Sequence, residues 1–240
     1  MATVKLELKK SLDNIKILET MTAPARAQLA ERCQWRRFKP GEQIINRDSD
    51  NRDVFFVSEG TLRIVNYSVS GREITLDDAV AGDHFGHFAA LDGQPRSANV
   101  VALTDSLIAM LAPMLFTQLL LDNPQIALAL MRNLAKLIRQ STERIMDLST
   151  LGANNRVHAE LLRLARRANK EAGVQGEASA ILRPIPVHSD IASRVSTTRE
   201  TVARVFGDLA RQGVIHREGD SLRVADLGVL EEMVLQVRGE

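Results

Sequence analysis

Short apolar runs separated by glycine-containing corners characterise the first half of the chain. Three β-like segments, residues 54–57, 61–67 and 73–80, carry apolar residues that cluster or alternate with polar ones. Glycines mark the corners beside them, at positions 41, 60, 71 and 82. Strands about ten residues apart with a turn signal at each corner are typical of an antiparallel sandwich or barrel.

A long amphipathic helix is predicted next. No glycine or proline occurs between Pro124 and Leu151, and apolar residues recur at gaps of mostly three and four. They are Ile126, Leu130, Leu134, Leu137, Ile145, Leu148 and Leu151. A helix this long usually needs a partner along its apolar face, so we predict a homodimer with parallel helices. The alternative, in which the helix packs only against its own barrel, stays open.

The rest of the chain has the element order of a small winged helix-turn-helix. Gly152 and Asn154-Asn155 interrupt the long helix and predict a domain boundary. The elements expected after it are a helix at 157–172, a strand at 182–187, a compact helical segment at 189–211, a hairpin at 214–225 and a last helix capped by Asp226. Helices followed by a two-stranded ribbon are typical of this motif.

Two closely spaced helices are expected within the compact segment. Ser189 is predicted to cap the first, and Thr197 with Glu200 has the Thr-x-x-Glu spacing of a capping box for the second. On a wheel of about 100° per residue, the second helix has an apolar side and a polar side. Val202, Val205, Phe206 and Leu209 fall on the apolar side, and Arg199, Glu200, Ala203 and Arg204 on the other.

The polar side of this second helix has the chemistry for reading DNA. Arginine binds guanine O6 and N7 through a bidentate fork, and glutamate accepts from cytosine N4. Thr198 and Thr201 are placed to hold backbone phosphates. Between Arg194 and Arg217 five arginines face two acids, which is the local charge expected of a DNA-binding face. On periodicity alone, an ordinary solvated helix surface with Glu200 engaged in capping stays open.

Composition and charge set limits on the function. The 240 residues are 45% hydrophobic and 25% charged, and the net charge of +1 excludes a globally basic nucleic-acid coat. Residues 1–15 carry no secretory signal, and the longest apolar run, 107–116, is too short to span a bilayer. We therefore expect a soluble cytoplasmic protein with no membrane partner. The single cysteine, Cys33, excludes an internal disulfide, an iron–sulfur cluster and a Cys-based zinc site within one chain.

The segment 198–204, Thr-Arg-Glu-Thr-Val-Ala-Arg, resembles the recognition helix of the cyclic-AMP receptor protein (CRP/FNR) family of transcription regulators. In that family an Arg-Glu-x-x-x-Arg triplet reads a TGTGA-like half-site, which implies the same role for Arg199, Glu200 and Arg204. The residues that follow match the end of the family's helix and the start of its wing. The resemblance extends from about residue 18 to the C-terminus.

Residues 85–91 and 93–98 resemble the phosphate-binding cassette of the family's cyclic-nucleotide-binding barrels. The physical chemistry agrees with this comparison. Gly86 lets backbone amides approach an anion closely, and Arg96 supplies a positive charge to the cyclic phosphate. Ser97 adds a hydroxyl. The resemblance thus implies a cyclic-nucleotide site at Gly86, His87, Arg96 and Ser97.

His87 departs from the family's pattern. It stands where the family has a glutamate that accepts from the ribose 2′-hydroxyl. A neutral imidazole accepts one hydrogen bond, whereas a protonated one accepts none. The expected consequences are weaker affinity, an altered ribose pose, pH sensitivity or a different effector. His84 and His87 are three residues apart, but without a Cys or carboxylate constellation beside them we predict no metal site.

Two polar residues, Ser141 and Thr142, interrupt the apolar pattern of the long helix. Polar residues in a dimer seam lower stability unless they set register or bind something. In the family a Thr-Ser pair at this place contacts the purine, one residue from each subunit, and here the order is reversed. Hydroxyls donate or accept, so they tolerate adenine's amino group or guanine's carbonyl. Two small polar residues on a helix surface are the open alternative.

The residues and the resemblance together predict an α+β fold in three parts. These are an N-terminal jelly-roll β-barrel that binds a cyclic nucleotide (1–123), a dimerisation helix (124–152) and a C-terminal winged helix-turn-helix that binds DNA (153–240). The expected protein is a homodimeric bacterial transcription regulator, not an enzyme. It binds TGTGA-like palindromes in double-stranded DNA when cyclic AMP, cyclic GMP or both occupy the barrel.

We expect the ligand to bridge Arg96 to Ser141 and Thr142, and no permanently bound cofactor. If the protein activates transcription, RNA polymerase is an expected partner, with Arg36, Arg37 and the segment 167–180 as contact candidates.

Two other functions stay open. The same architecture could respond to a different effector, including haem through His84 or His87, or to none, because His87 replaces the expected glutamate. An enzyme that uses the cassette as its catalytic pocket is the second. No Ser/His/Asp set, paired carboxylates or Walker loop stands out in support of it.

Overall fold

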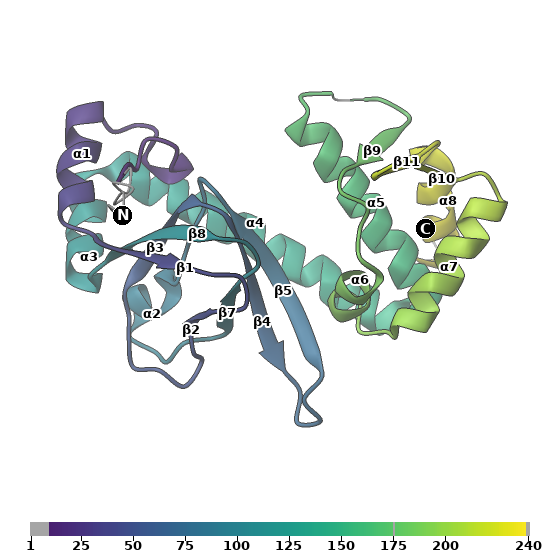
Figure 1. Ribbon diagram of the computed structural model, residues 1–240, viewed down its shortest axis with the longest axis horizontal. Helices are drawn as coiled ribbons and strands as arrows, with labels where there is room; N and C mark the ends of the chain where they lie inside the picture. The colour runs from purple at the N-terminus through teal and green to yellow at the C-terminus, as the bar shows by residue number, and fades with distance from the viewer. Residues whose placement is uncertain (1–9, 175, 239–240) are drawn as a thin grey trace, which may run out of the picture. The chain divides into compact units, whose positions relative to one another are not determined.

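The computed structural model describes residues 10–174 and 176–238, which form two compact units (Figure 1). The first comprises the chain up to Ser68 together with Thr75–Lys136, and the second comprises Val69–Ile74 together with Leu137–Glu240. Residues 1–9, which hold most of the segment predicted to lack a secretory signal, lie outside the described residues.

The first unit is mainly β-structure with helices at its ends. Its elements are η1 (Lys16–Leu18), α1 (Ala23–Glu31), β1 (Gln34–Phe38), β2 (Gln43–Ile45), β3 (Val54–Glu59), β4 (Thr61–Tyr67), β5 (Glu73–Val80), β6 (His84–Phe85), α2 (His87–Asp92), β7 (Asn99–Ala102), β8 (Ser106–Leu111), α3 (Pro113–Asp122) and the start of α4 (Pro124–Thr150). The three segments predicted as β-like correspond to β3, β4 and β5. The strands form two four-stranded sheets, in the orders β1-β8-β3-β6 and β2-β7-β4-β5.

The two sheets pack face to face around one apolar core (Figure 1). Strands β1, β8, β3 and β6 pair in antiparallel fashion, as do β2, β7 and β4. Phe55 and Ile108 from the first sheet meet Leu62 and Val100 from the second. This arrangement confirms the prediction of an antiparallel barrel-like domain.

The other face of the first sheet is covered by helices. Alternate residues of β3, Val54 and Phe56, are fully buried in a second core with Phe116 of α3 and residues of α1 and α4. Residues alternate between the two faces of a strand, so β3 reads as a continuous apolar run because both its faces are buried.

Helix α4 has two apolar faces rather than one. Ile126 and Leu130 are buried in the core of the first unit, so the prediction that they face a partner helix is wrong. A different stripe is exposed, with spacings of three and four residues: Leu128, Met131, Ala135, Ile138, Thr142 and Ile145. Periodicity identifies apolar positions but does not say which of them the first unit covers.

The second unit is a small helical domain with a three-stranded sheet. Its elements after α4 are α5 (Ala153–Glu171), β9 (Ala180–Leu182), α6 (His188–Arg194), α7 (Arg199–Arg211), β10 (Ile215–Glu218), β11 (Ser221–Val224) and α8 (Leu227–Arg238). The sheet order is β10-β11-β9, with β10 and β11 forming the expected hairpin. Helices α6 and α7 with this hairpin confirm a winged helix-turn-helix.

Local boundaries in the second unit differ from several of the predictions. Helix α5 begins at Ala153 rather than at 157, so the break after α4 falls at residues 151–152 and Asn154-Asn155 lie within α5. The strand expected at 182–187 is β9, which ends at Leu182, because Pro184 and Pro186 cannot donate hydrogen bonds to a ladder. Helix α6 follows an extended Val187, so Ser189 lies inside the helix and does not cap it. The cap at Asp226 is confirmed, since its carboxylate accepts from the backbone N–H of Gly228 at 2.8 Å.

The described ranges, 10–174 and 176–238, lack two features. None of their helices combines the length and the apolar character needed to cross a bilayer. The same ranges hold no group of three or more His, Cys, Asp or Glu side chains arranged to bind a metal ion.

Candidate functional site

Gly86 has a conformation and a packing environment that no other residue fits. Its φ of 79° lies in the left-handed region, immediately before α2. A Cβ atom there would lie 2.8 Å from Nη1 of Arg96, 2.9 Å from the ring of Phe55 and 3.0 Å from the carbonyl oxygen of Asp53. The glycine therefore lets the start of α2 lie directly against the Arg96 side chain.

Arg96 is buried, and only neutral oxygens accept from its guanidinium. Nη1 donates to the Gly86 carbonyl at 2.7 Å, and Nη2 donates to Asn51 Oδ1 at 2.9 Å and to the Asp53 carbonyl at 2.8 Å. Its Nε is buried without a hydrogen-bond partner. Burial lowers the pKa of Arg96, and the Asp53 carboxylate opposes this shift. An anion beside Nε would offset the cost of burying this charge.

His84 and His87 are neighbouring, partly buried imidazoles whose ring centroids lie 5.0 Å apart. His84 Nε2 and His87 Nδ1 are both buried without hydrogen-bond partners. Burial lowers the pKa of His84 to about 4 and that of His87 to about 3. Both rings are therefore neutral at pH 7, and His87 does not titrate between roughly pH 5 and 8. This disfavours the pH sensitivity considered from the sequence and leaves His87 able to accept one hydrogen bond.

The remaining predicted ligand contacts are solvent-exposed. Ser97 follows Arg96 directly, and its side chain lies at the surface. Ser141 and Thr142 lie on α4, in the part that belongs to the second unit, and both are exposed. The Thr142 hydroxyl donates to the carbonyl of Ile138 at 3.0 Å. The structure thus brings Gly86, His87 and Arg96 together, while Thr142 lies on the exposed apolar stripe of α4.

A hollow of about 340 Å³ lies in the first unit beside the partners of Arg96. Asn51, which accepts from Arg96, and Phe55, whose ring lies under the guanidinium, both form part of its wall. This volume is within the range of small-molecule sites. The wall does not include Gly86, His87 or Ser97, so the hollow is connected to the predicted contacts only through the partners of Arg96.

Helix α7 carries its charges on one exposed face, as predicted. Arg199, Glu200, Ala203 and Arg204 are exposed, while Val202, Val205, Phe206 and Leu209 are buried in the core of the second unit. Because the apolar side of α7 packs against the core, the charged side must face solvent. The exposed side at the N-terminal half of the helix is the surface that a recognition helix turns toward the major groove.

The start of α7 lies one residue later than the predicted capping box. Thr198 is the N-cap, and its hydroxyl oxygen accepts from the Thr201 N–H at 3.2 Å. The turn is longer because Ser196 adopts a left-handed φ of 51° and Thr197 is buried, donating to the Ala192 carbonyl. Glu200 is therefore not the reciprocal partner of a Thr197 cap. Its own N–H and the Thr198 hydroxyl lower its pKa.

Two residues that the sequence did not indicate connect the start of α5 to the helix-turn-helix. Nη2 of Arg204 donates to Asn154 Oδ1 at 3.2 Å. Arg156 donates from Nε to the Val195 carbonyl at 2.8 Å, from Nη2 to the Ser196 carbonyl at 3.1 Å and from Nη1 to the Leu151 carbonyl at 2.9 Å. These contacts join the first turn of α5 to the end of α4 and to the turn between α6 and α7. The acceptors of Arg156 are main-chain carbonyls, which every residue has, so no sequence pattern predicts these contacts.

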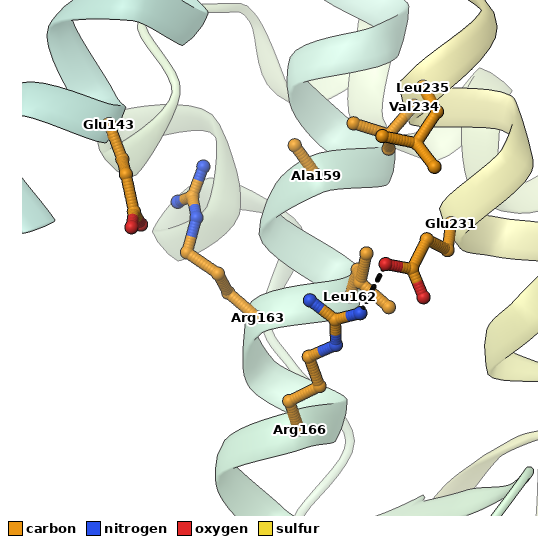
Figure 2. Close-up of a pocket in the computed structure, with 8 residues that line it drawn as sticks. All are labelled: Glu143, Ala159, Leu162, Arg163, Arg166, Glu231, Val234 and Leu235. Carbon is orange, nitrogen blue, oxygen red and sulfur yellow. Dashed lines mark ion pairs between the residues drawn. The ribbon is translucent and has the colours of Figure 1, made fainter. Parts of the chain in front are cut away.

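A shallow hollow of about 170 Å³ lies among α4, α5 and α8 (Figure 2). The two arginines in its wall already have carboxylate partners. Arg166 pairs with Glu231 at 2.6 Å (Figure 2), and Arg163 bonds the buried carboxylates Asp147 and Glu160. Burial raises the pKa of Glu160, and Arg163 opposes this shift. We interpret these contacts as a tie between α4 and α5 rather than as a ligand site.

Of the residues predicted to contact RNA polymerase, the two arginines are exposed, but the segment 167–180 is only partly a loop. Arg36 and Arg37 are exposed, Arg36 over the ring of Phe38 and Arg37 paired with Glu59 at 3.2 Å. The first residues of the segment 167–180 are helical, because α5 continues to Glu171.

The two units match known families separately. Residues 35–123 match the cyclic nucleotide-binding domain family, and residues 155–233 match the Crp-like helix-turn-helix domain family. The cyclic AMP receptor protein of Thermus thermophilus is 30% identical over 212 residues, covering 88% of this chain and 93% of that protein. The CRP-like cAMP-activated global transcriptional regulator of Mycobacterium tuberculosis is 26% identical over 210 residues, with coverages of 88% and 92%.

Solved structures share the fold across nearly the whole chain. A CooA mutant from Carboxydothermus hydrogenoformans has a TM-score of 0.77 at 21% identity and covers 95% of this chain and 97% of its own. The catabolite activator protein of Thermus thermophilus has a TM-score of 0.51 at 27% identity, with coverages of 92% and 99%.

Proposed function

Because this chain belongs to the CRP/FNR family of transcription regulators, we propose that it is a cyclic-nucleotide-responsive DNA-binding regulator. In this proposal it binds TGTGA-like palindromes as a homodimer when cyclic AMP, cyclic GMP or both occupy the first unit. The functional division is a ligand domain at 1–123, a dimerisation helix at 124–152 and a DNA-binding domain at 153–240. RNA polymerase is a further proposed partner.

The observation that carries the proposal is the set of unpartnered polar atoms around Gly86. Arg96 Nε, His87 Nδ1 and His84 Nε2 are all buried and lack hydrogen-bond partners. Buried polar atoms are seldom left unpaired, and each one needs a reason. A cyclic phosphate at Arg96 and a ribose hydroxyl at His87 would satisfy two of them. Ser97, Ser141 and Thr142 are the other proposed contacts, the last two to the purine.

The exposed stripe of α4 supports a homodimer. Leu128, Met131, Ala135, Ile138, Thr142 and Ile145 follow the 3-4 spacing of a coiled-coil seam. Ile138 and Ile145 are 67% and 62% exposed in the single chain, which is unusual for large apolar residues at helical spacing. Thr142 lies within this stripe, so a partner helix would cover it. This placement supports its proposed role beside the ligand.

The proposal is tested by measuring DNA affinity with each nucleotide in turn. We expect cyclic AMP or cyclic GMP to strengthen binding to a duplex with a TGTGA-like palindrome by roughly 5- to 150-fold, the usual range of allosteric coupling. Fluorescence anisotropy with a labelled duplex measures this, and a random duplex of equal length is the control. If calorimetry detects no heat with either nucleotide and DNA affinity does not change, the effector is not a cyclic nucleotide.

We predict that His87→Glu strengthens cyclic AMP binding by about tenfold. A carboxylate accepts a charge-assisted hydrogen bond, which is roughly twice as strong as one to a neutral imidazole. Calorimetry with cyclic AMP and its 2′-deoxy analogue measures the effect, because only the former offers a ribose 2′-hydroxyl. The variant is expected to discriminate against the analogue about tenfold more than the native protein does. His87→Gln, a neutral acceptor, is the matched control, and its ratio of cyclic AMP to 2′-deoxy analogue affinity should remain near the native value. If that ratio is also unchanged in His87→Glu, the ribose 2′-hydroxyl does not bind at this position.

A further inference from the structure

Arg204 is held by a residue outside its own helix. It lies on the exposed face of α7, four residues after Glu200. This spacing usually gives an ion pair on a helix surface. Among the described residues, however, no carboxylate lies within ion-pair distance of Arg204, and its Nη2 donates to Asn154 Oδ1 of α5 at 3.2 Å. The guanidinium is therefore oriented by a neutral oxygen, and its charge is not neutralised.

We propose that Asn154 is a positioning residue for DNA readout, holding the Arg204 guanidinium in place for a base edge. The proposal rests on the proposed function, in which Arg204 belongs to the base-reading triplet. An arginine has five N–H donors, of which Asn154 takes one, so a bidentate fork to guanine remains available. An Asp at this position would compete with DNA for the positive charge, whereas an amide does not.

The first turn of α5 is rigid enough to act as a fixed support. Arg156, two residues after Asn154, donates to the carbonyls of Val195 and Ser196 in the turn that precedes α7. Val157 is fully buried in the same core as Val202 of α7. Asn154 is thus fixed relative to the recognition helix by contacts that do not involve Arg204.

Holding the side chain before DNA arrives reduces the entropy lost on binding. A free arginine samples many rotamers, and immobilising such a side chain opposes association. When a support already fixes one end of the guanidinium, part of this side-chain entropy is lost during folding rather than on DNA binding. The expected effect is on discrimination between sequences, because a misdirected fork still contacts phosphates.

The test is a double-mutant cycle on the full chain with cyclic AMP present. Binding of Asn154→Ala, Arg204→Ala and the double variant is measured by anisotropy on a TGTGA-like palindrome and on a random duplex at one salt concentration. We expect Asn154→Ala to lower the ratio of specific to random affinity by about 5- to 10-fold, and to cause no further loss when Arg204 is already alanine. Asn155→Ala, the neighbouring amide, is the matched control and should change the ratio less than twofold.

Other outcomes overturn the proposal in distinguishable ways. If Asn154→Ala has the same effect with and without Arg204, or raises specific affinity, Asn154 does not position Arg204. If Arg204→Ala leaves the ratio unchanged, its base-reading role fails first, and the role of Asn154 fails with it. Thermal unfolding of each variant shows whether a lower affinity ratio comes from misfolding. Asn155→Ala separately controls for the removal of an amide from the same helical turn.

Discussion

Arg199→Ala is expected to reduce affinity for a TGTGA-like palindrome by on the order of 10²-fold or more. Each bidentate arginine–guanine pair contributes about 1–3 kcal/mol of discrimination, and a dimer would lose one pair in each half-site. Arg199 is fully available for this contact, at the exposed N-terminal end of α7. Affinity for random DNA should fall much less, because only charge is lost there. A mobility-shift titration on both duplexes measures the two effects.

The control for this variant is Arg211→Ala. It removes the same charge from the same helix, but at the C-terminal end, where Arg211 is ion-paired with Asp208. We expect less than a threefold change on either duplex. Equal losses on palindromic and random DNA for Arg199→Ala would contradict its role in reading bases and would leave it as a phosphate contact.

Arg96→Ala is expected to weaken cyclic-nucleotide binding by roughly 10- to 150-fold. A hydrogen bond to a charged group contributes about 1.5–3 kcal/mol, and Arg96 is the buried cation of the cassette. The variant also removes three hydrogen bonds, to the carbonyls of Gly86 and Asp53 and to Asn51 Oδ1, so its thermal midpoint should fall. Calorimetry with cyclic AMP measures affinity, and thermal unfolding reports how much of the protein is folded.

Arg96→Lys separates ligand binding from folding. Lysine keeps the charge but lacks the planar fork, so we expect retained folding with about a tenfold weaker ligand affinity. Arg47→Ala, an exposed arginine of the same unit, should leave both quantities unchanged. If Arg96→Lys binds as well as the native protein and Arg96→Ala is folded and also binds normally, the phosphate is not at Arg96.

The parts of the fold that the sequence predicts well are those with a strong local pattern. Strands β3 to β5, helix α4 and the β10–β11 hairpin were all identified from alternation, helical spacing or turn residues. The two faces of α4 were not separated, because Ile126 and Ile145 are equally apolar and only the packing of the first unit distinguishes them. The start of α7 differed by one residue because the left-handed Ser196 lengthens the turn.

The candidate sites were predicted only as far as side-chain chemistry is visible in the sequence. Gly86 and Arg96 were indicated by resemblance and by the chemistry of anion binding. Their neutral partners, Asn51 and the Asp53 carbonyl, are 45 and 43 residues from Arg96 in the chain and follow no motif. Asn154 and Arg156 were missed for the same reason, since contacts to carbonyls or between distant helices need the tertiary fold.

The two apolar faces of α4 contribute to stability in different ways, one independent of protein concentration and the other dependent on it. The face with Ile126 and Leu130 is buried within one chain, so its contribution to folding does not change on dilution. The exposed stripe gains burial only by association, and its contribution rises with protein concentration. In a dimer formed through this stripe, the amount of regulator in the cell would therefore set how many chains are paired, while every chain keeps a folded first unit.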